Sequence, residues 1–141
     1  MSRFILGLGL ISIIQMGLSS IGHAQESVDE QRKMAEDDEN KAFAFIKNEE
    51  WCKATNAFLD AYESVPQVVY IYNAAKAAEY AKDRKLALQL SLEMMGKFPS
   101  SDKQAEINTL IQKLSGEITS VGAGIPCPRT KKEAPTQAPL P

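Results

Sequence analysis

Few side chains in this sequence can carry out acid–base catalysis or hold a metal ion. The chain has one histidine, His23, and it lies in an N-terminal stretch that we expect to be removed from the mature protein. Histidine is the most frequent general base near neutral pH and the commonest metal ligand. Its absence beyond residue 24 favours a protein that is not an enzyme and that holds no metal or other cofactor.

The carboxylates do not replace the missing histidine. The acidic run Glu36-Asp37-Asp38-Glu39 and the pair Glu49-Glu50 bring like charges together in the sequence. Neighbouring residues of a helix point in different directions, and no apolar environment surrounds these charges. We therefore expect a solvated helix face at 36–39 and a polar turn at 48–50.

Cys52 and Cys127 are the only cysteines of the chain. In an oxidising compartment three states are open to them: one intramolecular disulfide, two free thiols, or a bridge between chains. An even number of cysteines in an exported protein favours the intramolecular bond. It would close a loop of about 75 residues and contribute roughly 4 kcal/mol in the chain-entropy model. Two cysteines without histidine do not make a tetrahedral metal site.

The N-terminal residues have the order of a secretory signal peptide. Arg3 precedes an apolar run at 4–18, and the small residues Gly22 and Ala24 follow it. The run is shorter than the roughly 20 apolar residues that an uncleaved anchor needs to span a bilayer. We expect cleavage near Ala24, so that residues 1–24 are the signal peptide and the protein is exported, to the bacterial periplasm or out of the cell.

Removal of this signal peptide leaves 117 residues, enough for one small domain, and changes the net charge from −2 to −3 because Arg3 is lost. A weakly acidic chain without a basic stripe is not expected to bind nucleic acid. No later segment of the sequence is apolar enough to span a membrane.

Residues 25–118 have the composition of a helical domain. Ala, Glu, Lys, Leu, Met and Gln dominate and favour helices, while Pro66 and Pro99 fall near expected helix ends. Ser27-Val28-Asp29-Glu30 and Ser101-Asp102-Lys103-Gln104 match capping boxes that would open the first and fifth helices. Glycine and proline make residues 119–141 a tail that we expect to be extended or disordered. Five helices are predicted, at about 28–47, 51–64, 66–81, 84–97 and 101–118.

Two helix pairs repeat at a spacing of 33 residues, each joined by a polar turn and ended by proline. The shift superposes the pairs Asn40/Asn73, Ala42/Ala75, Ala54/Ala87 and Pro66/Pro99. The first copy resembles the tetratricopeptide repeat (TPR) family at the family's aromatic, small and proline positions: Phe45, Trp51, Ala54, Phe58, Ala61 and Pro66.

The second copy matches the family less well. It keeps three small residues and the proline, namely Ala74, Ala75, Ala87 and Pro99. Other residues stand where the family has three aromatics and a small residue, namely Ala78, Arg84, Ser91 and Met94. The resemblance therefore covers Glu36 to Pro99 with one well-matched and one degenerate repeat.

The resemblance implies an all-α fold: a short right-handed stack of helix hairpins, a TPR-like solenoid of about two repeats, closed by the fifth helix as a capping helix. The alternative is a generic antiparallel helical bundle. Two repeats are fewer than the three or more that usually bury a continuous core. The long first helix, the capping helix or self-association would have to compensate.

In this family the first helix of each repeat lines a groove that holds a partner's extended peptide or helix. The resemblance implies the groove residues Asn40, Phe43, Lys47, Tyr72, Asn73, Lys76 and Tyr80. An asparagine amide both donates to and accepts from a peptide backbone, but Asn40 and Asn73 can equally cap or bridge helices. Tyr72 and Tyr80 share a helix face around Lys76, which suits either an interface or half-buried packing.

Together these features predict a non-catalytic adaptor or scaffold of the bacterial cell envelope that binds a peptide or helix of another protein. The alternative is a self-associating assembly component. An enzyme would need a cluster of acid–base residues around a pocket, and the sequence beyond residue 24 indicates none.

Overall fold

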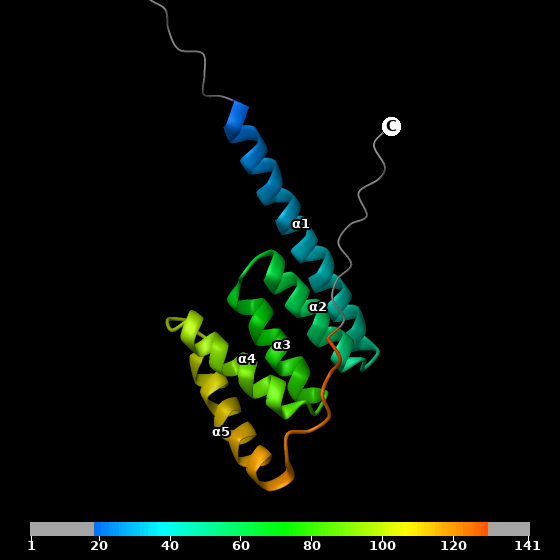
Figure 1. Ribbon diagram of the computed structural model, residues 1–141, viewed down its shortest axis with the longest axis vertical. Coiled ribbons are helices and arrows are strands. Elements are labelled where there is room, and N and C mark those ends of the chain that lie inside the picture. The colour runs from blue at the N-terminus through cyan, green and yellow to red at the C-terminus, as the bar shows by residue number, and fades with distance from the viewer. Residues whose placement is uncertain (1–18, 130–141) are drawn as a thin grey trace, which may run out of the picture.

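The protein is an all-α chain. The computed structural model describes the backbone of residues 19–129 and the side chains of residues 27–129. Most of the predicted signal peptide (1–24) and the last part of the predicted tail (130–141) lie outside the described residues. The described part contains five helices, and none of them is long and apolar enough to cross a membrane. They are α1 Ser19–Lys47, α2 Trp51–Ser64, α3 Val68–Tyr80, α4 Arg84–Lys97 and α5 Gln104–Val121 (Figure 1).

The turns that separate the helices depend on a few residues. Glu49 and Lys82 have φ angles of 58° and 65°, in the left-handed region. Glu49 lies in the turn after α1, and Lys82 lies in the turn between α3 and α4. Asp83 caps α4, because its Oδ1 accepts the N–H of Leu86 at 3.1 Å. The predicted bounds of α2 and α4 are confirmed at both ends.

The starts of α1 and α3 differ from the prediction. α1 begins at Ser19, so that Ser27-Val28-Asp29-Glu30 lies inside the helix and does not open it. No glycine or proline falls between residues 23 and 47 to interrupt this helix. α3 begins at Val68 after an extended Gln67, two residues beyond Pro66.

The predicted capping box at the start of α5 does not form either. The residue before the helix is Lys103, whose side chain does not cap it. The Oγ of Ser101 accepts the N–H of Lys103 at 3.1 Å, and the Gln104 amide donates to the carbonyl of Phe98 at 2.7 Å. A local turn and a bond to the end of α4 thus replace the reciprocal bonds of a capping box.

Alanine makes up much of the core. Each helix packs against the next one in the chain, and small residues allow their backbones to approach closely while larger ones fill the remaining space. The fully buried alanines of α2 and α3 are Ala54, Ala61, Ala74, Ala75 and Ala78. The largest fully buried apolar side chains are Phe58, Ile71, Met94, Ile107 and Leu114.

The helices present two different faces. Side chains of α1, α3 and α5 meet on one face, where Phe43 of α1 shares a cavity with Asn73 of α3, and Lys113 of α5 bonds Glu79 of α3. α2 and α4 carry the other face, which a C-terminal segment crosses. We call these the groove face and the covered face.

Residues 122–129, here called the strap, are the segment that crosses the covered face (orange in Figure 1). α5 continues to Val121, so the helical part ends three residues later than predicted. Gly124 then forms an isolated bridge with Asp83, and the carbonyl of Pro128 accepts the Asn56 amide at 2.8 Å. This part of the predicted tail is extended and attached to the helices rather than disordered.

Candidate partner-binding groove

A cavity of about 340 Å³ opens on the groove face between α1, α3 and the first half of α2. We call it the groove cavity. Its lining is mostly apolar with one amide and one ammonium group: Phe43, Ile46, Trp51, Phe58, Asn73, Lys76, Ala77 and Tyr80. Binding sites are commonly concave and apolar, with a few polar groups that fix the orientation of the ligand.

Four of the eight lining residues are aromatic. Trp51 stacks on Tyr80 with ring centroids 4.6 Å apart and 22° between the ring planes, which joins the start of α2 to the end of α3. Phe43 meets the buried Phe58 edge-on at 5.5 Å. Phe43 and Tyr80 are nevertheless 44% and 55% exposed, so both rings offer apolar surface to another molecule.

The two polar groups of the cavity differ in how they are held. Lys76 is fixed, because its Nζ bonds Glu79 at 2.6 Å and lies 5.8 Å from the centroid of the Tyr80 ring. The half-buried Asn73 makes no side-chain hydrogen bond within residues 27–129. Its amide is thus available both to donate and to accept at the wall of the cavity.

The structure brings four of the seven predicted groove residues together in this lining: Phe43, Asn73, Lys76 and Tyr80. Asn40 and Lys47 lie exposed on α1 and do not line the cavity. The sequence identifies Trp51 and Phe58 only as packing positions of the repeat and does not indicate Ile46 or Ala77. Trp51 and Phe58 pack between helices and also line the groove cavity, because a side chain between two helices forms the floor of the space above it.

Tyr72 is bonded to a neighbouring helix instead. Its hydroxyl donates to the Glu106 carboxylate of α5, and Lys103 Nζ lies 5.3 Å from its ring centroid. Burial, together with the hydrogen bond and negative charge of Glu106, raises the pKa of Tyr72 to about 12. Tyr72 and Tyr80 therefore differ: the first joins α3 to α5, and the second lines the groove cavity.

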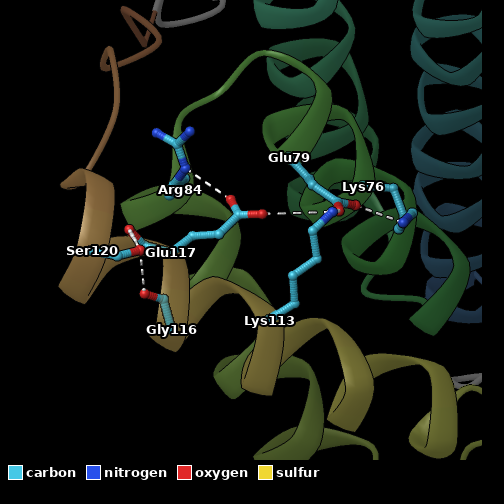
Figure 2. A network of polar contacts seen from close by, with 7 residues as sticks. All are labelled: Lys76, Glu79, Arg84, Lys113, Gly116, Glu117 and Ser120. Carbon is cyan, nitrogen blue, oxygen red and sulfur yellow. Dashed lines mark hydrogen bonds and ion pairs between the residues drawn. The ribbon is translucent and has the colours of Figure 1, made fainter.

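Ion pairs tie α3, α4 and α5 together beside the groove cavity (Figure 2). Glu79 bonds Lys76 at 2.6 Å and Lys113 at 2.7 Å, while Glu117 bonds Arg84 at 2.8 Å and lies 3.9 Å from Lys113. Burial raises the pKa of Glu79, but the hydrogen bonds from both lysines outweigh it, so that its pKa lies below the ordinary value. These bonds hold α5 on α3, and the open part of the groove face lies between α1 and α3.

The strap is fixed on the covered face by a disulfide and a shared carboxylate. Cys127 is bonded to Cys52 of α2 with Cα atoms 5.2 Å apart, the intramolecular state among the three that the sequence leaves open. The N–H of Cys127 donates to the Oδ2 of Asp83 at 2.8 Å. The buried Asp83 carboxylate thus accepts one bond from the start of α4 and one from the strap.

Two carboxylates, one on α1 and one on α2, are withdrawn from solvent. Asp38 is 2% exposed and pairs with Lys41 at 2.9 Å, so the expected solvated face at 36–39 is wrong at this residue. It lies three residues after Ala35 and four before Ala42, on the side of α1 that packs on α2. Asp60 of α2 pairs with Arg129 at the end of the strap at 2.9 Å, while burial raises its pKa.

The described residues contain no group of three or more His, Cys, Asp or Glu side chains placed to hold a metal ion. Comparison of the chain with protein-family models, with curated proteins and with solved structures found no match.

Proposed function

We propose that the protein is a non-catalytic binding module whose groove cavity holds a peptide or helix of another protein, as an adaptor or scaffold of the bacterial cell envelope. The observation that supports this most directly is the groove cavity itself. Two partly exposed aromatic rings, Phe43 and Tyr80, lie beside an amide without a hydrogen bond in the described residues, Asn73. Aromatic anchors with a polar group that fixes the orientation of the chain are typical of protein interfaces.

The groove cavity would bind its partner through two kinds of contact. An apolar side chain of the partner packs among the rings of Phe43, Trp51 and Tyr80, which are already held by stacking and edge contacts. Rings fixed in advance lose little conformational entropy on binding. The Asn73 amide bonds a peptide group of the partner, and the Lys76 ammonium donates to a carbonyl or carboxylate oxygen.

We further propose that Glu36 to Pro99 is a TPR-like pair of helix hairpins with α5 as the capping helix. The order of the hairpins and the complete burial of Ala54, Phe58 and Ala61 support this proposal. The exposed residues of α5 are mainly polar, among them Asn108 and Gln112, as is required of a terminal capping element. Such an end face disfavours self-association through α5.

Selection of peptides from a random phage-displayed library tests the binding function. The oxidised protein is immobilised, selected peptides are synthesised, and their dissociation constants are measured by fluorescence anisotropy. We expect Phe43→Ala and Asn73→Ala each to weaken binding by about 10-fold or more, because each removes a central contact. The matched control is Gln89→Ala, an exposed change on the covered face.

Two outcomes would contradict the proposal. The first is undiminished binding of the selected peptides to both groove variants, and the second is an equal loss in the Gln89→Ala control. Sedimentation velocity at several protein concentrations addresses the assembly alternative, since a monomer throughout excludes self-association. The export part is tested separately by the mass of the mature chain, which should begin after Ala24.

A further inference from the structure

We propose that the Cys52–Cys127 disulfide is a thiol-exchange site whose reduction alters the groove cavity. The regulatory part of this proposal rests on the function proposed above. The two cysteines differ in exposure: Cys127 is only 9% exposed, whereas the half-buried Cys52 lines an open hollow of about 430 Å³. The other residues of the hollow are Glu49, Glu50, Trp51, Lys53, Tyr80 and Ala81.

We infer that this difference in exposure selects Cys52 for attack. A thiolate of a dithiol, R(SH)₂, enters the hollow and attacks the Sγ of Cys52, forming a mixed disulfide while Cys127 leaves as a thiolate. The second thiol of the reductant then displaces Cys52 and closes the reductant's own disulfide. Two electrons pass to the protein, and the two protons of the dithiol end on Cys52 and Cys127.

The hollow shares a wall with the groove cavity. Trp51 and Tyr80 line both spaces, and their stacked rings join the start of α2 to the end of α3. Cys52 directly follows Trp51 in the sequence. A change in the position of Cys52 therefore acts on the ring that forms this wall.

The strap is a second connection between the start of α2 and the end of α3. Cys127 is bonded to Cys52 at the start of α2, while its N–H and Gly124 both contact Asp83, three residues after Tyr80. The strap lies tightly on this turn, because a Cβ atom on Gly124 would fall 1.7 Å from the carbonyl oxygen of Lys82. In the oxidised protein the start of α2 is thus held to the α3–α4 turn through the strap as well as through the rings.

Reduction removes the covalent half of this connection. The start of α2 then depends more on the Trp51–Tyr80 stack, an interaction that a partner in the groove cavity also uses. We expect Trp51 to gain mobility and the wall of the cavity to loosen, so that a partner must order it again on binding. The reduced protein is therefore the weaker binder.

The exchange step is tested by adding reduced glutathione to the protein with its disulfide intact and no glutathione attached. Mixed disulfides are trapped by acid and alkylation and located by mass spectrometry, and we expect the adduct mainly on Cys52. An adduct mainly on Cys127, or no reaction without denaturant, would overturn the proposal. The tryptophan fluorescence of the same samples reports on the wall, since Trp51 is the only tryptophan of the chain.

We expect reduction by dithiothreitol to shift the Trp51 emission to longer wavelength and to increase its quenching by acrylamide, with the far-UV circular dichroism retained. The Cys52→Ser, Cys127→Ser double variant should show the same shift without reductant, which separates loosening from any effect of the new thiols or of the reductant itself. An unchanged emission wavelength in this variant would contradict the proposed effect of the disulfide on the Trp51 wall of the groove cavity. Loss of the helical signal on reduction does so too, since regulation requires a folded reduced protein.

Peptides selected on the groove then decide the regulatory part. We expect at least about 5-fold weaker binding to the reduced protein and to the double variant than to the oxidised protein. Equal affinities overturn the regulation. If no peptide binds the groove in either state, the proposed function fails, while the glutathione adduct and the Trp51 emission still decide the exchange step and its effect on the wall.

Discussion

The groove face and the covered face use the same helices in opposite ways. On the covered face the polar groups that meet the strap are bonded: Asp83 accepts two N–H groups, Asn56 holds Pro128, and Arg129 pairs with Asp60. On the groove face the cavity leaves aromatic surface exposed. Satisfied polar groups stabilise one conformation, whereas an exposed apolar surface with an available amide is suited to recognition.

This contrast separates stability from binding. Changes on the covered face remove bonds between segments far apart in the chain, so we expect them to lower the free energy of unfolding. Changes in the groove cavity remove exposed surface, so we expect them to act on affinity and hardly on unfolding. Three variants test this division, and a fourth, Glu79→Gln, tests the ion pairs that lie beside the groove cavity.

The largest effect is expected from the disulfide. The Cys52→Ser, Cys127→Ser double variant should lose about 4 kcal/mol of unfolding free energy, because a closed loop of 75 residues restricts the unfolded chain. Urea unfolding followed by circular dichroism measures the loss. Reduced wild-type protein should match the double variant, and a loss below about 1 kcal/mol would show that the strap contributes little to stability.

Gly124→Ala should have the next largest effect. Its φ of 89° is unfavourable for alanine, and the new Cβ would overlap the carbonyl oxygen of Lys82. We expect a loss of about 2–3 kcal/mol as the strap moves off the α3–α4 turn. The matched control is Gly116→Ala in α5, where no atom lies within 4 Å of the new Cβ and helix propensity predicts a gain of up to about 1 kcal/mol. Similar effects of both changes would contradict the tight seat of the strap.

Glu79→Gln should lower stability by about 1–2 kcal/mol near neutral pH, since Lys76 and Lys113 lose their shared carboxylate. The pKa of Glu79 is lower in the folded protein, so its contribution is present above the ordinary pKa of 4.5 and is lost as the pH falls through the lowered value. The gap between variant and wild type should therefore close in acid. Unfolding curves over this pH range check the sign, with the exposed Glu30→Gln as the control.

Phe43→Ala should have the smallest effect on folding. The ring is partly exposed and meets one buried ring edge-on, so we expect a loss of no more than about 1 kcal/mol of unfolding free energy. The same change should weaken peptide binding by about 10-fold or more. A large loss of stability without an effect on binding would reverse the roles assigned to the two faces.

The sequence determined the features that depend on local order. Helix propensity and the positions of proline, glycine and polar turns predict an all-α chain and the bounds of α2 and α4. The groove residues depended on the resemblance to the TPR family, and four of those seven meet in one cavity. Local order did not give the start of α1, because no breaking residue marks it.

Only the tertiary structure decided which side chains are bonded within the protein and which are exposed to a partner. Tyr72 and Tyr80 look equivalent on their helix, yet a residue 34 positions away bonds only the first. Asp38 stands in a charged run, yet the helical period turns it toward α2. The strap looks like part of a loose tail, yet Asn56 holds it from 72 residues away. Each of these outcomes depends on a partner distant in the sequence, and periodicity and composition report only on neighbours along the chain.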